Sequence, residues 1–334
     1  MEKKISVNFK DTEVKEFDSG VTLYEISKYF NQYYNYPILI GTVDNDIAEL
    51  SDKLTRSCTI NFYDRSSEVG NSIYSRTTQF LLVLAVKGLF GSNVDVTIEH
   101  SIDKGYYCEI EGIDIDKPDI CDLENKMHEL VKEDIVINRV SVSRLDAIKY
   151  FEKKNMIDKV KVLKYISNTY INLYNAKGIY DYFYGKLAHS TGQIDEFKLT
   201  YIKGNGFVLS YPTYYNPECT LDYVHHEMLF DKFLDYTNWG RKVGISNAYD
   251  LNNTVSRGES GNVIRLAEAY YDNQIAAISE KIAANNWGYF FILNFNINYF
   301  LWPIDRKHIN YQTYTHNKLT KNISIKWRDK ILGC

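Results

Sequence analysis

The chain has 334 residues, enough for two or three domains, and its 45% hydrophobic and 25% charged residues are typical of a globular protein. A formal net charge of −4 argues against nucleic-acid binding driven by bulk charge, although a local basic patch is compatible with it. No apolar run approaches the roughly 20 residues that cross a bilayer, and Glu2, Lys3 and Lys4 follow Met1 with no apolar core segment after them, so we expect no secretory signal. We therefore expect a soluble chain that partners neither membrane nor DNA.

The cysteines indicate a reducing compartment. They are scattered and odd in number, and no two form a C-x-x-C pair. This pattern fits idle or buried thiols, and it predicts neither a zinc ribbon nor a redox motif. We expect a cytoplasmic protein.

The first sixty residues predict a helix packed on a small mixed sheet. Ile5, Val7 and Phe9 alternate with polar residues, and the strand at 14–17 returns after a turn, which indicates a hairpin. A helix is expected at 23–33, ended by Pro37, because the residue before a proline avoids the helical region. Strands are expected at 38–43 and 58–63.

The rest of the chain mixes helices and strands, so we predict an α+β fold. A very apolar helix at 73–90 is expected to be buried nearly all round, and Ser143 is the expected N-cap of a helix at 147–154. The other expected elements are strands at 94–98, 106–110, 135–142, 169–173 and 197–201, a helix from 117 to 130, and mostly helices after 221.

Two clusters of reactive residues invite a chemical interpretation. His225, His226 and Glu227 are adjacent, so their side chains diverge on a helix and cannot converge on one metal ion. His100 and Cys108 flank a predicted hairpin beside Tyr107 and could pair as base and nucleophile. No third orienting group is evident, so we favour simple packing for this pair.

Two further features could bind a ligand. Tyr180, Tyr182 and Tyr184 alternate with other residues, so a strand would place the three rings on one face. The rings could line a groove for a nucleoside or an RNA base. We favour the alternative, in which they belong to a half-buried edge strand. Arg265 could reach a phosphate, but such an arginine more often covers its own helix face. The candidate binding residues are His100, Tyr107, Tyr182, Tyr184 and Arg265, and no catalytic residue is assigned.

Several blocks resemble known modules. "VNFKDTEVKEFDSGVTLYEIS" and "IGTVDNDIAELSDKL" resemble the TGS domain, a β-grasp module that begins threonyl-tRNA synthetases. "QFLLVLAVKGLF", "EHSIDKGYYCEI", "LENKMHELVKEDI" and "DEFKLT" resemble the editing-type second domain of these enzymes. With "YDYFYG", "STG" and "WGRKVGIS", the order over residues 4–284 resembles bacterial uridine-kinase-like (nucleoside kinase) proteins, which carry both modules ahead of a P-loop kinase domain.

The resemblance implies four regions: a TGS-like β-grasp domain at 1–63, an editing-like α+β domain at 64–215, a helical connector at 216–284, and an aberrant tail at 285–334. The editing site of the synthetases uses H-x-x-x-H on a helix and C-x-x-x-H on a later segment. Here Phe80 and Leu84 stand at the first pair of positions, and Phe183 and Leu187 at the second. None of these side chains can bind a metal or move a proton, so we expect neither zinc nor editing.

The kinase part of the resemblance is incomplete. After Ala284 the chain has no G-x-x-x-x-G-K-[ST], so the backbone cradle that binds ATP phosphates is missing. Reading possible codons of 297–309 one base later permits a P-loop-like string, which suggests a frameshift near 285–296. No cofactor is expected in this chain, and ATP and magnesium are implied only for the missing kinase domain.

Three functions follow. The first is an accessory or regulatory region of a uridine-kinase-like protein, inactive alone because it lacks the ATP site. The second is an RNA- or tRNA-binding module related to threonyl-tRNA synthetase without editing activity. The net charge of −3 over residues 1–63 argues against strong RNA binding by that region alone. The third is a nucleoside site near Tyr182 and His100.

Overall fold

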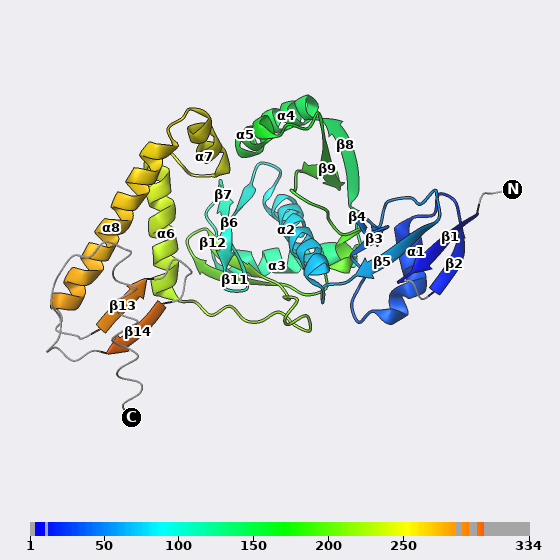
Figure 1. The fold of residues 1–334 in the computed structure, drawn as a ribbon, viewed down its shortest axis with the longest axis horizontal. Coiled ribbons are helices and arrows are strands. Elements are labelled where there is room, and N and C mark those ends of the chain that lie inside the picture. The colour runs from blue at the N-terminus through cyan, green and yellow to red at the C-terminus, as the bar shows by residue number, and fades with distance from the viewer. Residues whose placement is uncertain (1–3, 11–12, 285–288, 294–298, 304–334) are drawn as a thin grey trace, which may run out of the picture. The chain divides into compact units, whose positions relative to one another are not determined.

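The computed structural model describes residues 4–10, 13–284, 289–293 and 299–303. Helices and strands are mixed along the chain (Figure 1), which confirms the predicted α+β class. The chain forms two compact units, residues 1–253 and residues 254–334. No described helix has the length and apolarity needed to cross a membrane.

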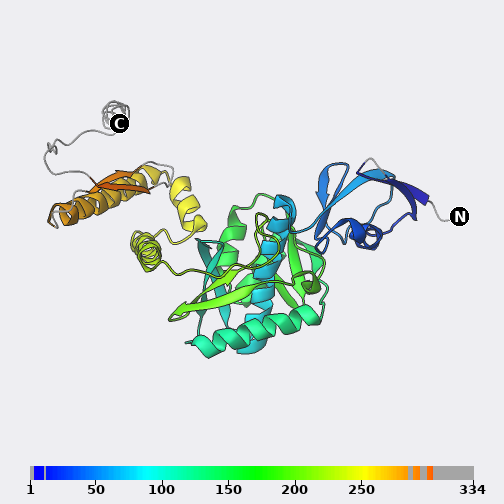
Figure 2. The same ribbon diagram turned by 90° about the horizontal axis from the view of Figure 1, so that it is seen from below.

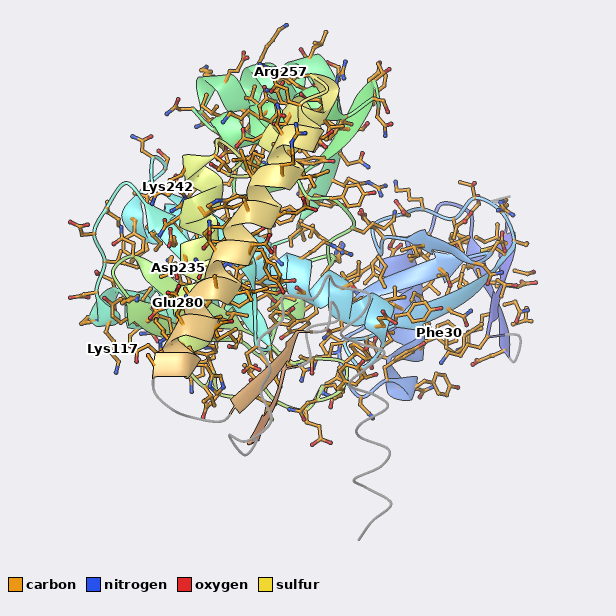
Figure 3. The ribbon with its side chains drawn as sticks, turned by 60° about the vertical axis from the view of Figure 1, so that its left-hand side comes forward. Phe30, Lys117, Asp235, Lys242, Arg257 and Glu280 are labelled. Atoms are coloured by element: carbon orange, nitrogen blue, oxygen red, sulfur yellow. The ribbon has the colours of Figure 1, made fainter. Side chains whose placement is uncertain are left out.

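The amino-terminal module is a five-stranded sheet in the order β2-β1-β5-β3-β4 with one helix packed on it. Its elements are β1 Lys4–Phe9, β2 Glu13–Asp18, α1 Leu23–Phe30, β3 Ile40–Val43, β4 Asp46–Ala48 and β5 Cys58–Tyr63. The central strand β1 pairs antiparallel with β2 and parallel with β5, so the sheet is mixed as predicted. Thr22 begins α1 with a capping box to Glu25, and Phe30, labelled in Figure 3, ends it in the core.

A four-stranded sheet and two long helices form the centre of the second module. The elements are α2 Glu68–Phe90, β6 Asp95–Ile102, β7 Gly105–Glu111, α3 Lys117–Lys132, β11 Lys198–Lys203 and β12 Gly206–Ser210, with strand order β11-β12-β7-β6. Helices α2 and α3 share one core with this sheet (Figure 2), and α2 has buried side chains on every side, as its apolar run predicted. On the other sheet face, Phe230 of α6 (Glu227–Lys242) packs against Tyr107 and Val208.

A smaller layer completes the module. Its elements are β8 Asn138–Ser143, α4 Arg144–Lys153, α5 Ile157–Tyr165, β9 Tyr170–Ala176 and β10 Ile179–Asp181, with strand order β10-β9-β8. The helices α4 and α5 cover this sheet through Phe151, Leu163 and Leu173. The predicted cap is confirmed, because the Ser143 hydroxyl accepts a hydrogen bond from the amide of Asp146.

Several elements differ from the sequence-based prediction, among them α2, α5 and β12. Helix α2 begins at Glu68 and not at 73, because Ser67 caps it by accepting a hydrogen bond from the Gly70 amide at 3.0 Å. Helix α5 and strand β12 were not predicted, since nine residues rich in lysine and a five-residue apolar run give weak periodic signals.

The remaining elements are α7 Ala248–Ser256, α8 Ser260–Ala284, and the antiparallel pair β13 Tyr289–Leu293 and β14 Tyr299–Pro303. The suspected frameshift at 285–296 and the codon string over 297–309 fall mostly outside the described residues.

Candidate functional site

The four positions that the resemblance assigns to editing chemistry form part of the hydrophobic core. Phe80 and Leu84 lie one turn apart on α2 and, like Leu187, are buried. The Phe183 ring packs edge-on against Phe80, with 5.6 Å between ring centroids. All four side chains belong to one core. Phe80 and Phe183 thus contact each other directly, and all four positions hold groups that neither ionise nor coordinate.

An ion pair between the partly exposed Lys159 and the buried Asp181 lies beside this apolar cluster. Lys159 Nζ is 2.6 Å from Asp181 Oδ1 and 5.6 Å from the centroid of the Phe183 ring. The amide of Tyr182 also donates to Asp181 Oδ1, at 2.7 Å. Sequence reasoning missed Lys159 because it lies on α5, and pairing of residues so distant in sequence leaves no local signal.

Next to this cluster is a groove of about 240 Å³, which we call the tyrosine groove. It combines aromatic rings, two asparagine amides, a lysine and one carboxylate, contributed by three separate segments. Its main side chains are those of Glu49, Asn168, Tyr170, Asn172, Tyr174, Tyr182, Phe183, Tyr184 and Lys186. Two of its rings face solvent, because the exposed fraction is 65% for Tyr170 and 91% for Tyr184.

The carboxylate in the groove comes from the amino-terminal module. Glu49 is almost fully buried; its Oε1 accepts a hydrogen bond from Tyr174 at 2.5 Å, and its Oε2 lies 3.1 Å from Arg139 Nη1. The same Arg139 donates to Asp52 at 2.5 Å. Burial raises the pKa of Glu49, against the opposing effects of Tyr174 and Arg139. This network ties the first module to β8 and β9 and forms one wall of the groove.

His100 and Tyr107 lie on the α6 side of the four-stranded sheet, away from the core that contains Cys108. The His100 ring stacks on Phe233 with centroids 4.7 Å apart, and Tyr107 donates a hydrogen bond to Glu109 at 2.8 Å. Burial lowers the pKa of His100, and burial raises the pKa of the Cys108 thiol. The geometry fits packing, because the imidazole and the thiol face opposite sides of the sheet.

The tyrosine series follows one strand only in part. Strand β10 ends at Asp181, so the expectation of one continuous strand through Tyr184 is wrong. The chain instead turns at Gly185, whose φ of +130° favours glycine. Tyr182 and Tyr184 line the groove, and Tyr180 and Tyr182 both pack against the α4–α5 core.

The other candidates lie outside the groove lining. Arg265 is exposed on α8 and donates to Asn262 of the same helix at 2.6 Å. His225 lies 3.2 Å from the Tyr223 hydroxyl. Within the described ranges, no three His, Cys, Asp or Glu side chains are grouped so that they could hold a metal ion.

No family model matches the chain. The chain is similar to threonine–tRNA ligases: 27% identical over 260 residues to that of Acetivibrio thermocellus, covering 74% of this chain and 40% of the ligase. The ligase of Carboxydothermus hydrogenoformans is 31% identical over 202 residues (60% of this chain, 32% of the ligase), and that of Legionella pneumophila 31% over 201 residues (60% and 31%). The chain thus spans about a third to two fifths of the length of these relatives. They support the synthetase part of the expected resemblance and lend no support to the kinase part.

Proposed function

We propose that this chain is an RNA-binding module, related to threonyl-tRNA synthetase, that contacts tRNA-like RNA without hydrolysing an aminoacyl bond. The proposal rests on the contrast between two adjacent regions. The assigned editing positions are packed hydrocarbon, while the neighbouring tyrosine groove is open and lined by rings and polar groups.

Hydrolysis of an ester needs a group that activates water or transfers a proton. Phe80, Leu84, Phe183 and Leu187 supply none, and their close packing leaves them unable to hold a metal-bound water. Lys159 and Asp181 are charged but pair with each other, and only the carboxylate is buried. The site is therefore suited to structure and not to catalysis.

The groove is suited to unpaired bases. Every base has a flat face that stacks on aromatic side chains, and such stacking tolerates any sequence. Tyr170 and Tyr184 present exposed rings, and Asn168 and Asn172 add amides that can donate to and accept from base edges.

A basic surface next to the groove supplies what the overall charge lacks. Residues 144–164, which form α4 and α5, carry seven Lys/Arg and three Asp/Glu. Lys149, Lys153, Lys154 and Lys164 are exposed. The groove lining resumes at Ile166, directly after α5. Phosphates of a strand entering the groove could therefore pair with this local excess of positive charge.

The narrower reading, an accessory region of a uridine-kinase-like protein, rests on the sequence resemblance alone. Its P-loop would fall in the part of the chain beyond Ala284 that is mostly outside the described residues. A nucleoside site shared by Tyr182 and His100 has no geometric support, because the two lie on different surfaces.

The test is binding of deacylated tRNA to the full chain by fluorescence anisotropy over a range of salt concentrations. We expect saturable binding that Tyr184→Ala and Tyr170→Ala each weaken about tenfold, in line with the loss of one stacked base. Replacing the four exposed lysines with methionine should flatten the salt dependence.

Tyr236→Ala serves as the matched control, since Tyr236 is exposed on α6 outside the groove lining. Incubation with aminoacyl-tRNA should release no amino acid above the buffer rate. Release that depends on the protein, or tRNA affinity that is the same in the groove variants as in the original chain, would contradict the proposal.

A further inference from the structure

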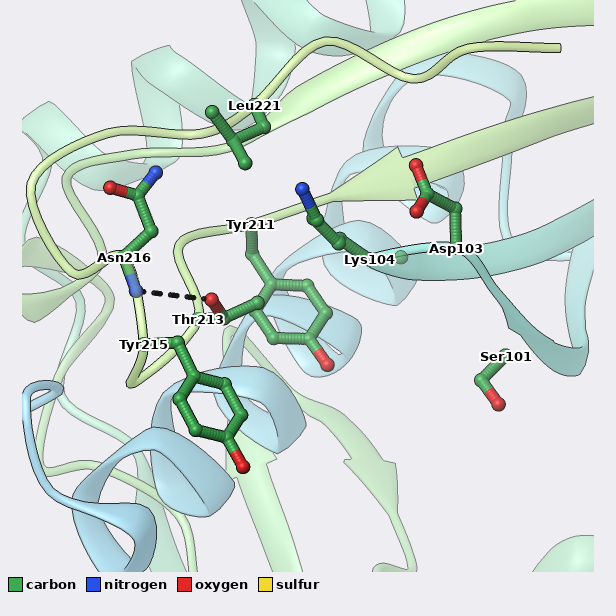
Figure 4. Close-up of a pocket in the computed structure, with 9 residues that line it drawn as sticks. Ser101, Asp103, Lys104, Tyr211, Thr213, Tyr215, Asn216 and Leu221 are labelled. Carbon is green, nitrogen blue, oxygen red and sulfur yellow. Dashed lines mark hydrogen bonds between the residues drawn. The ribbon is translucent and has the colours of Figure 1, made fainter. Parts of the chain in front are cut away.

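A second cavity, separate from the tyrosine groove, lies at the turn between β6 and β7. Its volume is about 360 Å³, within the usual range for small-molecule sites. The turn contributes Asp103 and Lys104, and the segment after β12 contributes Tyr211, Thr213, Tyr215 and Asn216. Figure 4 shows the two tyrosine rings between the Asn216 amide on one side and the two turn residues on the other.

The two rings offer a flat apolar surface with one fixed part and one open part. Tyr211 stacks on Tyr106, with 5.7 Å between centroids and 17° between planes, so its ring is held in place. Tyr215 is 82% exposed and is supported by the adjacent Tyr214 ring at 3.9 Å. An exposed tyrosine beside an anchored one is the arrangement that stacks on a planar ligand.

The polar groups around the rings indicate the charge of that ligand. Lys104 is exposed, extends from the turn toward Tyr211 (Figure 4), and has no hydrogen-bond or ion-pair partner among the described residues. One unpaired ammonium matches one negative charge. Asp103 offers a carboxylate to hydroxyl groups. Thr213 adds a hydroxyl that accepts a hydrogen bond from the Asn216 backbone N–H at 3.3 Å, and Asn216 adds a side-chain amide that also donates to the Cys219 carbonyl.

We propose that this cavity binds a nucleotide. The base stacks on Tyr211 and Tyr215, the phosphate pairs with Lys104, and Asp103 accepts from the sugar hydroxyls. The nucleotide has two possible sources, a free mononucleotide or an unpaired nucleotide of an RNA strand, and only the second rests on the proposed RNA binding. The single ammonium matches the single charge of a phosphodiester, which favours the strand.

The experiment titrates the full chain with two probes, adenosine 5′-monophosphate and a short single-stranded oligoadenylate. Tyr215→Ala should weaken binding of the probe about tenfold, because one stacking partner is lost. Lys104→Met should also weaken it and, for the oligoadenylate, should reduce the slope of log affinity against log salt by about 0.7. Both residues are exposed, so we expect thermal unfolding to match that of the original chain.

Tyr184→Ala separates this site from the tyrosine groove, and it should leave the affinity for adenosine 5′-monophosphate unchanged. Binding of the oligoadenylate alone would identify the strand as the source, and binding of the monophosphate would identify the free nucleotide. The proposal fails if neither probe binds saturably, or if both cavity variants bind as tightly as the original chain. Loss of tRNA binding in Tyr184→Ala but not in Lys104→Met would support the proposed function independently of this site.

Discussion

The apolar cluster of Phe80, Leu84, Phe183 and Leu187 and the tyrosine groove share one short segment, residues 183–187, yet they differ in every physical respect. The cluster is packed into the hydrophobic core, whereas the groove exposes rings, amides and a lysine. Side chains of this segment face one region or the other, and Phe183 contacts both. This difference indicates that neighbouring side chains of one loop contribute separately to stability and to ligand binding. Each property can therefore be altered without the other.

The largest effect should come from the cluster. Phe80→Ala removes a fully buried ring and leaves a cavity between α2 and residues 183–187. We expect the free energy of unfolding to fall by about 3–5 kcal/mol. Urea denaturation followed by circular dichroism measures the change. A loss below about 1 kcal/mol would mean that the cluster is not packed as described.

A smaller effect is expected at the boundary between the modules. Arg139→Met leaves Glu49 buried without its cationic partner, and we expect a loss of about 1–3 kcal/mol, reduced from the fully buried case because Arg139 is partly exposed. Arg56→Met is the matched control, because Arg56 pairs with Asp44 at 2.7 Å on the surface and should cost less than about 1 kcal/mol. Equal losses in the two variants would show that the Glu49 network adds nothing beyond a surface ion pair.

The groove should show the opposite profile to the cluster. Tyr184→Ala is expected to cost about 1–3 kcal/mol of RNA affinity, measured by anisotropy. The same change should alter the free energy of unfolding by no more than about 0.5 kcal/mol, because the ring is solvent-exposed. A variant that loses stability and affinity together would remove the distinction between the two regions.

The smallest expected effect is on the pH dependence of stability, and it involves His100, which lies in neither the cluster nor the groove. Burial lowers the pKa of His100 below its ordinary value of 6.5. The unfolded chain therefore binds more protons in the window below that value, so the contribution of His100 to stability is present above it and is lost as the pH falls through the folded pKa. We expect His100→Phe to reduce this acid sensitivity, measured as melting temperature between about pH 5 and 8. Parallel melting curves for the original chain and His100→Phe would contradict the assignment.

Much of the fold could be predicted because its signals are local. Alternation identified β1, a very apolar run identified α2, and Ser143 identified the start of α4. The α+β class followed from these elements. The prediction for the residues after Asp181 was wrong. The alternating tyrosines suggest that the strand continues, but its pairing with β9 ends at Asp181.

The candidate site was predicted less completely. The resemblance singled out residues 80, 84, 183 and 187, and all four belong to one core, in which Phe80 contacts Phe183. Sequence alone did not reveal the contacts of Arg139 with Glu49 and Asp52, or of Lys159 with Asp181, because each joins elements that meet only in the folded chain. His100 and Tyr107 were candidate binding residues together with Tyr182 and Tyr184, but the structure places them against α6, away from the tyrosine groove.

The all-round burial of α2 over residues 80–86 limits how this chain can change in length. Each residue of an α-helix advances the rotation by about 100°, so inserting or deleting one residue between Ser67 and Phe80 would turn every later side chain away from its present neighbours. A helix with one solvent-exposed face can tolerate such a rotation. Around residues 80–86, however, close-packed atoms surround the helix on all sides. Insertions and deletions should therefore be tolerated in the connecting turns and rejected within this helix.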